Sequence, residues 1–112
     1  MTIVHLLDGN RLILALSGDL DLTTADALAE ALDDILNHYP QKEVALDLGE
    51  VDFIDSSGLG VILGRYRRLS RQGRALSLVS VRPQVRAVFE IAGIPAIMPV
   101  LSSGVKSSTR GL

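Results

Sequence analysis

The sequence predicts a single α/β domain with a mixed central sheet of about five strands and three to four helices, in the order β-β-α-β-α-β-α-β. Apolar runs with strand character alternate with longer segments of helical periodicity, and Gly or Pro stands at most of the boundaries. The 112 residues suit one domain, and 47% hydrophobic against 4% aromatic residues indicates an aliphatic core. We expect the domain over residues 1–101 and a flexible polar tail over 102–112.

A β-hairpin and a helix are expected first. Residues 2–7 and 11–17 are apolar runs separated by Asp-Gly-Asn, which is typical of a turn. A helix should follow, because Thr23 and Asp26 resemble a capping box and Pro40 prevents continuation. Its core face would consist of Ala25, Leu28, Leu32, Ile35 and Leu36.

Strands and helices alternate in the rest of the chain. Residues 44–48 and 75–81 read as strands, and the segment between them has helical spacing. The next helix should begin at Pro83 and end at Gly93, and residues 94–100, with two prolines, would form an edge strand. The core faces of these two helices would be Leu59, Ile62, Leu63, Tyr66 and Leu69, with Ser57, Val61, Gly64 and Arg68 opposite, and then Val85, Val88, Phe89 and Ala92.

Charge is divided unevenly along the chain. Residues 1–55 hold 12 of the 13 acidic and 2 of the 11 basic residues, which gives −10, whereas residues 56–112 carry +8. We expect these charges to pair between helices rather than form a nucleic-acid patch. The scarcity of aromatic residues also removes a stacking platform for single strands, so no direct nucleic-acid partner is expected.

Composition also points to a compartment. The chain has no cysteine, no apolar run of membrane-spanning length and no basic segment after Met1. We therefore expect a cytoplasmic protein that makes no membrane contact.

One polar stretch stands where a strand feeds a helix: Asp-Ser-Ser-Gly-Leu-Gly at residues 55–60. The carboxyl end of a strand is the usual place for a site in an α/β sheet. Any of the first three residues could cap the helix. Gly58, Gly60 and Gly64 need another explanation, because each glycine inside a helix costs roughly 1 kcal/mol relative to alanine. Either they let the helix lie close on the sheet, or they let a partner's backbone approach.

Residues 55–66, Asp-Ser-Ser-Gly-Leu-Gly-Val-Ile-Leu-Gly-Arg-Tyr, resemble the signature of bacterial anti-sigma factor antagonists, the founding members of the STAS domains. The Gly-Arg-Tyr continuation looks most like the sporulation sigma-F branch. The resemblance extends over roughly residues 3 to 100, through Gly-Asp-Leu-Asp at 18–21 with Thr24-Ala25, Val-Arg-Pro-Gln-Val-Arg at 81–86 and Phe-Glu-Ile-Ala-Gly-Ile at 89–94. The final amphipathic helix that is usual in this family is not evident after Leu101.

The resemblance implies a binding module, not an enzyme, that is switched by phosphorylation. The unmodified domain would bind an anti-sigma factor that is also an ATP- or ADP-bound serine kinase, and so release the sigma factor. Phosphorylation of Ser56 would end binding, and a metal-dependent serine phosphatase would reset the switch. No cofactor is implied, and the free domain is expected to be a monomer. The expected partner-binding residues are Asp21, Thr24, Asp55, Ser57, Gly58, Leu59 and Gly60, of which Asp55 and Ser57 could instead cap the helix.

Two alternatives use the same 55–60 loop. A serine-dependent hydrolase would need a histidine base, and the chain offers only His5 and His38, without a Gly-x-Ser-x-Gly elbow. A small nucleotide-binding α/β domain would fit the glycine spacing. However, no acidic residue ends the next strand to hold a ribose, and the P-loop lysine is missing.

The connector carboxylates suggest two further alternatives. Asp52 and Asp55 could hold a hard cation, although two carboxylates on a connector are more often solvated, so no metal site is expected. A phosphoacceptor aspartate, either Asp47 or Asp52, would need other acids and a lysine, and no lysine follows until Lys106.

Overall fold

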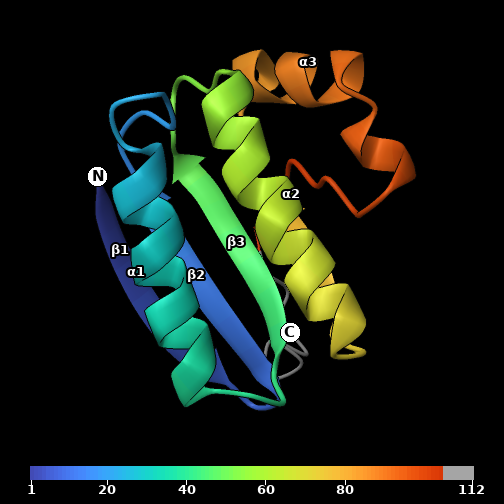
Figure 1. Ribbon diagram of the computed structural model, residues 1–112. Helices are drawn as coiled ribbons and strands as arrows, with labels where there is room; N and C mark the ends of the chain where they lie inside the picture. The colour runs from blue at the N-terminus through green and yellow to red at the C-terminus, as the bar shows by residue number, and fades with distance from the viewer. Residues whose placement is uncertain (105–112) are drawn as a thin grey trace.

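The computed structural model describes residues 1–104, which form a four-stranded mixed sheet with three α-helices and a short 3₁₀-helix (Figure 1). The strands lie in the order β1-β2-β3-β4; β1 is antiparallel to β2, and the other pairs are parallel. The strands are β1 (Thr2–Asp8), β2 (Arg11–Ser17), β3 (Glu43–Glu50) and β4 (Leu76–Val79). The helices are α1 (Ala25–His38), α2 (Ser56–Arg71), α3 (Pro83–Ile91) and η1 (Ile94–Ala96).

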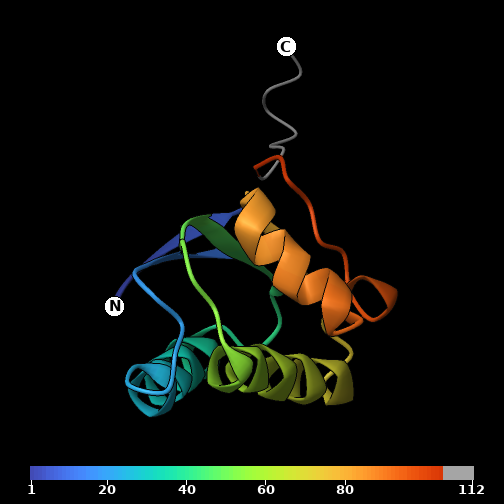
Figure 2. The same cartoon turned by 90° about the horizontal axis from the view of Figure 1, so that it is seen from above.

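The expected hairpin is confirmed, and it sets the two faces of the sheet. β1 and β2 pair in register from Thr2 with Ser17 to Asp8 with Arg11, on either side of a two-residue turn in which Gly9 has a φ of 61°. Every second residue of β2 is buried, so one face of the sheet is apolar and covered. α1 and α2 lie side by side on that face, while no helix in residues 1–104 covers β1 and β2 on the other (Figure 2).

The helix faces follow the predicted periodicity in α1, and the buried face of α2 is wider than predicted. Four of the five expected residues of α1 are buried, and Ile35 is partly buried against the core. In α2, Ile62 and Leu69 are buried as predicted, and the other three expected residues, Leu59, Leu63 and Tyr66, are partly buried against the core. The buried side also includes Gly58 and Val61. The expectation that Val61 faces away from the core was therefore wrong.

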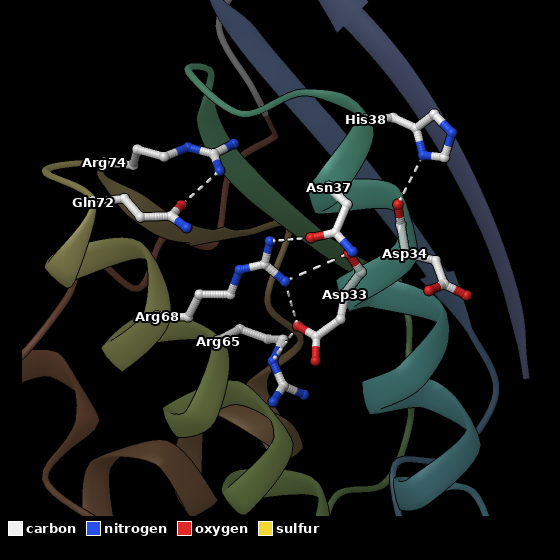
Figure 3. A network of polar contacts seen from close by, with 8 residues as sticks. All are labelled: Asp33, Asp34, Asn37, His38, Arg65, Arg68, Gln72 and Arg74. Atoms are coloured by element: carbon white, nitrogen blue, oxygen red, sulfur yellow. Dashed lines mark hydrogen bonds and ion pairs between the residues drawn. The ribbon is translucent and has the colours of Figure 1, made fainter.

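Opposite charges pair between α1 and α2, as the charge asymmetry predicted (Figure 3). Asp33 of α1 lies 3.2 Å from Nε of Arg65 and 3.0 Å from Nη1 of Arg68, and Arg68 also donates to the Asn37 amide oxygen. Nη1 of Arg65 is buried without a hydrogen-bond partner among the described residues. This cluster orients the two helices that begin beside the candidate site.

The expected last strand over residues 94–100 was wrong. Ile94–Ala96 form η1 after Gly93, which has a φ of 77° and ends α3. The chain then runs beside β4 from Pro99 to Ser103. The Leu78 N–H donates to Pro99 O (2.9 Å), and the Leu101 N–H donates to Leu78 O (2.8 Å). Only Val100 forms a bridge, with Leu78, because Pro99 has no N–H to extend the ladder on its side.

α3 begins at Pro83, as predicted, and its buried residues are Val85 and Phe89. Ala92, expected on the core face, is exposed because the helix ends at Ile91 and the chain turns away. A bilayer core could not be spanned by any helix within residues 1–104, since the longest, α2, has only 16 residues.

Candidate functional site

Asp55 caps α2 and thereby leaves both following serine hydroxyls unused. Its backbone is extended, and Oδ1 accepts hydrogen bonds from the N–H groups of Ser57 (2.8 Å) and Gly58 (3.1 Å). These are two of the free donors that every helix N-terminus presents. No hydrogen bond to the Ser56 or Ser57 hydroxyl occurs within residues 1–104. The Ser56 side chain, at the first position of α2, is exposed, whereas Ser57 is half-buried.

A second loop lies against this helix start. Beyond the end of β2, the Leu20 N–H donates to Phe53 O (3.0 Å) and the Asp55 N–H donates to Leu20 O (3.1 Å). The Leu22 N–H reaches Oδ2 of Asp55 at 3.3 Å. One carboxylate therefore holds α2 with Oδ1 and the loop before α1 with Oδ2, which joins two segments over 30 residues apart in sequence.

Asp21 and Thr24 fold that loop into a tight turn. Oδ1 of Asp21 accepts from the Thr23 hydroxyl (2.6 Å), the Thr23 N–H (2.9 Å) and the Thr24 N–H (3.2 Å). The Thr24 hydroxyl donates to Asp19 O at 2.8 Å. The expected capping box of Thr23 with Asp26 is therefore wrong, because Asp21 satisfies these amides instead. The hydrogen bond from the Thr23 hydroxyl, helped by the two backbone amides, lowers the pKa of Asp21 below its ordinary 3.8.

The glycines of α2 have different roles. A Cβ on Gly58 would stand 2.4 Å from Leu20 O and 2.8 Å from Leu20 Cβ, so this glycine lets the helix lie directly on the neighbouring loop. Gly58 is buried and does not form a contact surface. A Cβ on Gly60 or Gly64 would meet nothing within 4 Å. Gly60 is exposed and leaves room for another chain to approach.

Sequence reasoning missed two exposed apolar side chains in the two loops that pair beside the start of α2. Leu22 is 77% exposed and Phe53 is 51% exposed. Leu22 stands between Asp21 and Thr23, and Phe53 follows Asp52, so a large apolar residue next to a polar one in a connector could have singled them out. Exposed apolar side chains grouped around one site are typical of a protein-binding surface.

Arg82 also escaped the sequence analysis. It precedes α3, and its guanidinium donates to Gly49 O (2.6 Å), to a carboxylate oxygen of Asp52 and to Oε2 of Glu50 (3.3 Å). All three acceptors lie at the end of β3 or in the connector that leads to Ser56. Arg82 therefore holds this connector in place and partly balances its negative charge.

The structure brings the predicted site residues together at the carboxyl ends of β2 and β3. Asp21 and Thr24 lie in the loop that Asp55 binds, and Ser56, Ser57 and Gly60 lie in the first turns of α2. Leu59 is only partly exposed, because its side chain packs against the core. The region at these strand ends is acidic, with carboxylates at Asp19, Asp21, Glu50, Asp52 and Asp55.

The catalytic alternatives find no support in this arrangement. His38 ends α1, whose 14 residues span about 21 Å from the loop at its other end. Both histidines of the chain instead line a hollow with Tyr39, beside β1. Within residues 1–104, no three His, Asp or Glu side chains converge in a way that could hold a metal ion.

Comparison with known proteins shows the family of the chain. A family model described as STAS domain matches residues 3–107. The anti-sigma F factor antagonist of Paenibacillus polymyxa is 36% identical over 99 residues, which cover 88% of this chain and 85% of that protein. The anti-sigma-B factor antagonist of Listeria monocytogenes is 31% identical over 96 residues, or 83% of this chain and 81% of that protein.

A solved structure shares the fold. The Bacillus cell fate determinant SpoIIAA in its phosphorylated form superposes with a TM-score of 0.68 over 98% of this chain and 96% of that chain, at 20% identity. The two chains therefore share their overall fold. The chain therefore belongs to the STAS domain family, among the anti-sigma factor antagonists.

Proposed function

We propose that this protein is a phosphorylation-switched anti-sigma factor antagonist. In its unmodified form it binds an anti-sigma factor that is also a serine kinase, in the ATP- or ADP-bound state, and the sigma factor is released. Phosphorylation of Ser56 ends this binding, and a metal-dependent serine phosphatase restores the active form. The names of the curated relatives, antagonists of anti-sigma F and anti-sigma-B factors, support this role. The higher identity to the sigma-F relative supports the sporulation branch.

The observation that carries the proposal is that Asp55 caps α2, whereas the neighbouring Ser56 does not take part in the cap. Because Asp55 caps the helix, the Ser56 hydroxyl is exposed and has no structural hydrogen bond to lose. Ser57 is the weaker acceptor, since it is half-buried behind the cap. The exposed side chains of Leu22 and Phe53 belong to the loops that pair beside the start of α2, which supports a docking surface shared with Ser56.

The location of Ser56 also explains how one group can block binding and spare the fold. A phosphate adds a charge of roughly −1.5 to −2, which the helix dipole and the free amides of the first turn favour. The same phosphate would add to the negative charge at the carboxyl ends of β2 and β3, in the surface to which the exposed Leu22 and Phe53 are proposed to belong. A partner docked there would have to desolvate that charge, so its affinity would fall.

The chemistry of the switch is a reversible phosphoryl transfer. Oγ of Ser56 attacks the γ-phosphorus of the kinase-bound ATP, its hydroxyl proton leaves, and ADP is the leaving group. The phosphatase reverses the outcome with water, which regenerates the serine hydroxyl and releases inorganic phosphate. This domain contributes the acceptor hydroxyl and its geometry, and the kinase contributes the nucleotide site.

The experiment is phosphate mapping with matched serine variants. The full chain is incubated with its anti-sigma serine kinase and ATP, and mass spectrometry locates the phosphate. We expect one phosphate on Ser56, its loss in Ser56→Ala, and its retention in Ser57→Ala. Phosphate on Ser57 alone, or undiminished phosphorylation of Ser56→Ala, would refute the assignment.

A further inference from the structure

The outer edge of β1 is a second surface that the proposed function does not use. β1 is the first strand of the sheet and pairs only with β2, so its other edge has no strand beside it within residues 1–104. Its side chains are also poorly covered. Val4 is 61% exposed, Leu6 is 60% exposed and Leu7 is 47% exposed. Ser56 lies on another element, although the loop that contains Thr24 borders β1 at Ile3.

This edge lacks the features that normally keep sheet edges apart. Exposed edge strands usually carry Lys, Pro or a bulge that prevents pairing with another chain. β1 has none of these, and its seven residues pair with β2 without a register shift. Between Thr2 and Asp8 its only polar residue is His5. A strand of this composition is suited to being covered, not to facing solvent.

On the helix-covered face of the sheet, α1 does not cover β1 completely. Ile3 lines a hollow of about 330 Å³ with Ala27 and Ala31 of α1. His5 lines another, of about 240 Å³, with Asp34 and Tyr39 at the other end of the helix. β1 is thus open along its edge, on its uncovered face and at two places beneath α1.

The sequence of β1 is self-complementary about His5. If a second copy runs antiparallel to the first with His5 opposite His5, then Val4 lies opposite Leu6 and Ile3 lies opposite Leu7. Thr2 then lies opposite Asp8, a pair of residues that can hydrogen-bond. Residues directly opposite each other in an antiparallel pair share a face, so every apolar residue of β1 meets an apolar residue.

We propose that two copies of this chain, which the family resemblance led us to expect as a monomer, associate through β1 to form an eight-stranded sheet with a two-fold axis at His5. A two-fold axis demands that the same patch serve both partners, and the β1 register meets that demand. Strand addition supplies backbone hydrogen bonds, and the Val4–Leu6 and Ile3–Leu7 pairs supply apolar burial. The eight residues after Gly104 include only two large apolar side chains, Val105 and Leu112, so they are a poor chemical match for this surface.

The first test is the mass in solution, measured by sedimentation equilibrium over roughly 1 μM to 1 mM protein, the range that brackets a small interface. We expect a concentration-dependent rise from 12.0 kDa to twice that mass. Leu6→Lys should hold the protein at the lower mass. The control is Ile91→Lys on α3, a residue that is 90% exposed and distant from β1, and it should dimerise like the original chain (Figure 1).

Cysteine cross-linking tests the register, because the natural chain has no cysteine. His5→Cys places two thiols at the axis, so mild oxidation or a short bis-maleimide should join two chains. Thr2→Cys alone should not, whereas Thr2→Cys mixed with Asp8→Cys should. Circular dichroism and the phosphorylation assay confirm that each variant is folded, because neither depends on dimerisation.

Three results would overturn the proposal. One is a monomer throughout the concentration range. Another is a dimer that Leu6→Lys leaves intact or that position 5 does not cross-link. The third is a dimer that forms only after residues 105–112 are removed, since the chain's own last residues would then be what covers β1.

Discussion

At the scale of single residues, Asp55 determines what the neighbouring serines can do. Three residues in a row had side chains able to cap α2, and sequence alone could not choose among them. The choice depends on Leu22, whose N–H binds the second oxygen of Asp55. A carboxylate can serve both the helix and this loop, whereas a serine hydroxyl has one oxygen only.

Gly58 and Gly60 should respond in opposite directions to the same substitution. Gly58→Ala forces a Cβ to within 2.4 Å of Leu20 O, a backbone atom, and should destabilise the fold by about 1–3 kcal/mol or more. Gly60→Ala meets open space and should stabilise it by up to about 1 kcal/mol. Denaturant midpoints at constant m-value measure both. Equal effects from the two variants would show that α2 does not rest on Leu20.

Asp21 should make the loop before α1 sensitive to acid. Its pKa is lowered in the fold by the Thr23 hydroxyl, so the ionised form is favoured more in the folded than in the unfolded chain. This stabilisation is complete above the ordinary 3.8 and is lost as pH falls through the lower folded value. Carboxyl ¹³C titration by NMR should find Asp21 titrating below 3.8, with the Thr23 amide shifting in parallel. Asp21→Asn should abolish that step, and a titration at or above 3.8 would contradict the turn geometry.

At the scale of elements, the periodic pattern predicted α1 well and α2 less well, for a physical reason. α1 meets the sheet with one stripe of leucines, so spacing alone identifies its buried face. α2 is drawn against Leu20 through Gly58, and this rotates its buried side toward Val61. A contact between residues 38 positions apart leaves no trace in the local hydropathy of either segment.

Some residues of the candidate site could likewise be predicted from the sequence, and others could not. Residues 55–60 could be predicted because they are contiguous and stand between a strand and a helix. Arg82 could not, because its role depends on the end of β3 and the start of α3 lying side by side. Leu22 and Phe53 fall between these cases, since their composition is unusual for loops but their shared surface arises only from the pairing of the loops.

Arg82 should act on the connector that presents Ser56. Arg82→Gln removes three hydrogen bonds from Gly49, Glu50 and Asp52, one of them to a backbone carbonyl, so a loss of about 1 kcal/mol in unfolding free energy is expected. Amide exchange at residues 51–55 should become faster, and phosphorylation of Ser56 slower. Arg86→Gln is the matched control, because Arg86 carries the same charge but donates to Val100 O. If both variants change amide exchange at residues 51–55 to the same extent, Arg82 does not specifically hold this connector.

At the scale of the whole molecule, the pairing of residues 99–103 with β4 bears on where the domain ends. The boundary expected at Leu101 falls within this pairing, since the Ser80 N–H donates to Ser103 O at 2.8 Å. A chain of residues 1–104 should keep the thermal midpoint of the full protein. A chain of residues 1–101 should lose about 1 kcal/mol, equivalent to a shift of about 4–8 °C for a domain of this size. Calorimetry measures both, and a large drop for residues 1–104 would show that the last eight residues stabilise the fold.

In the proposed switch, a phosphate on Ser56 disrupts binding without disturbing the fold. The most direct measurement is calorimetric affinity for the nucleotide-bound kinase, with the unmodified protein, the enzymatically phosphorylated protein and Ser56→Asp compared in parallel with their denaturant midpoints. We expect the phosphorylated form to bind at least tenfold more weakly, a loss of about 1.4 kcal/mol in binding free energy, and its free energy of unfolding to change by no more than about 1 kcal/mol. Ser56→Asp should change both quantities in the same directions, with a smaller effect on binding because it adds only one charge. Undiminished affinity of the phosphorylated protein for the kinase, or unfolding of the phosphorylated protein, would show that Ser56 is not such a switch.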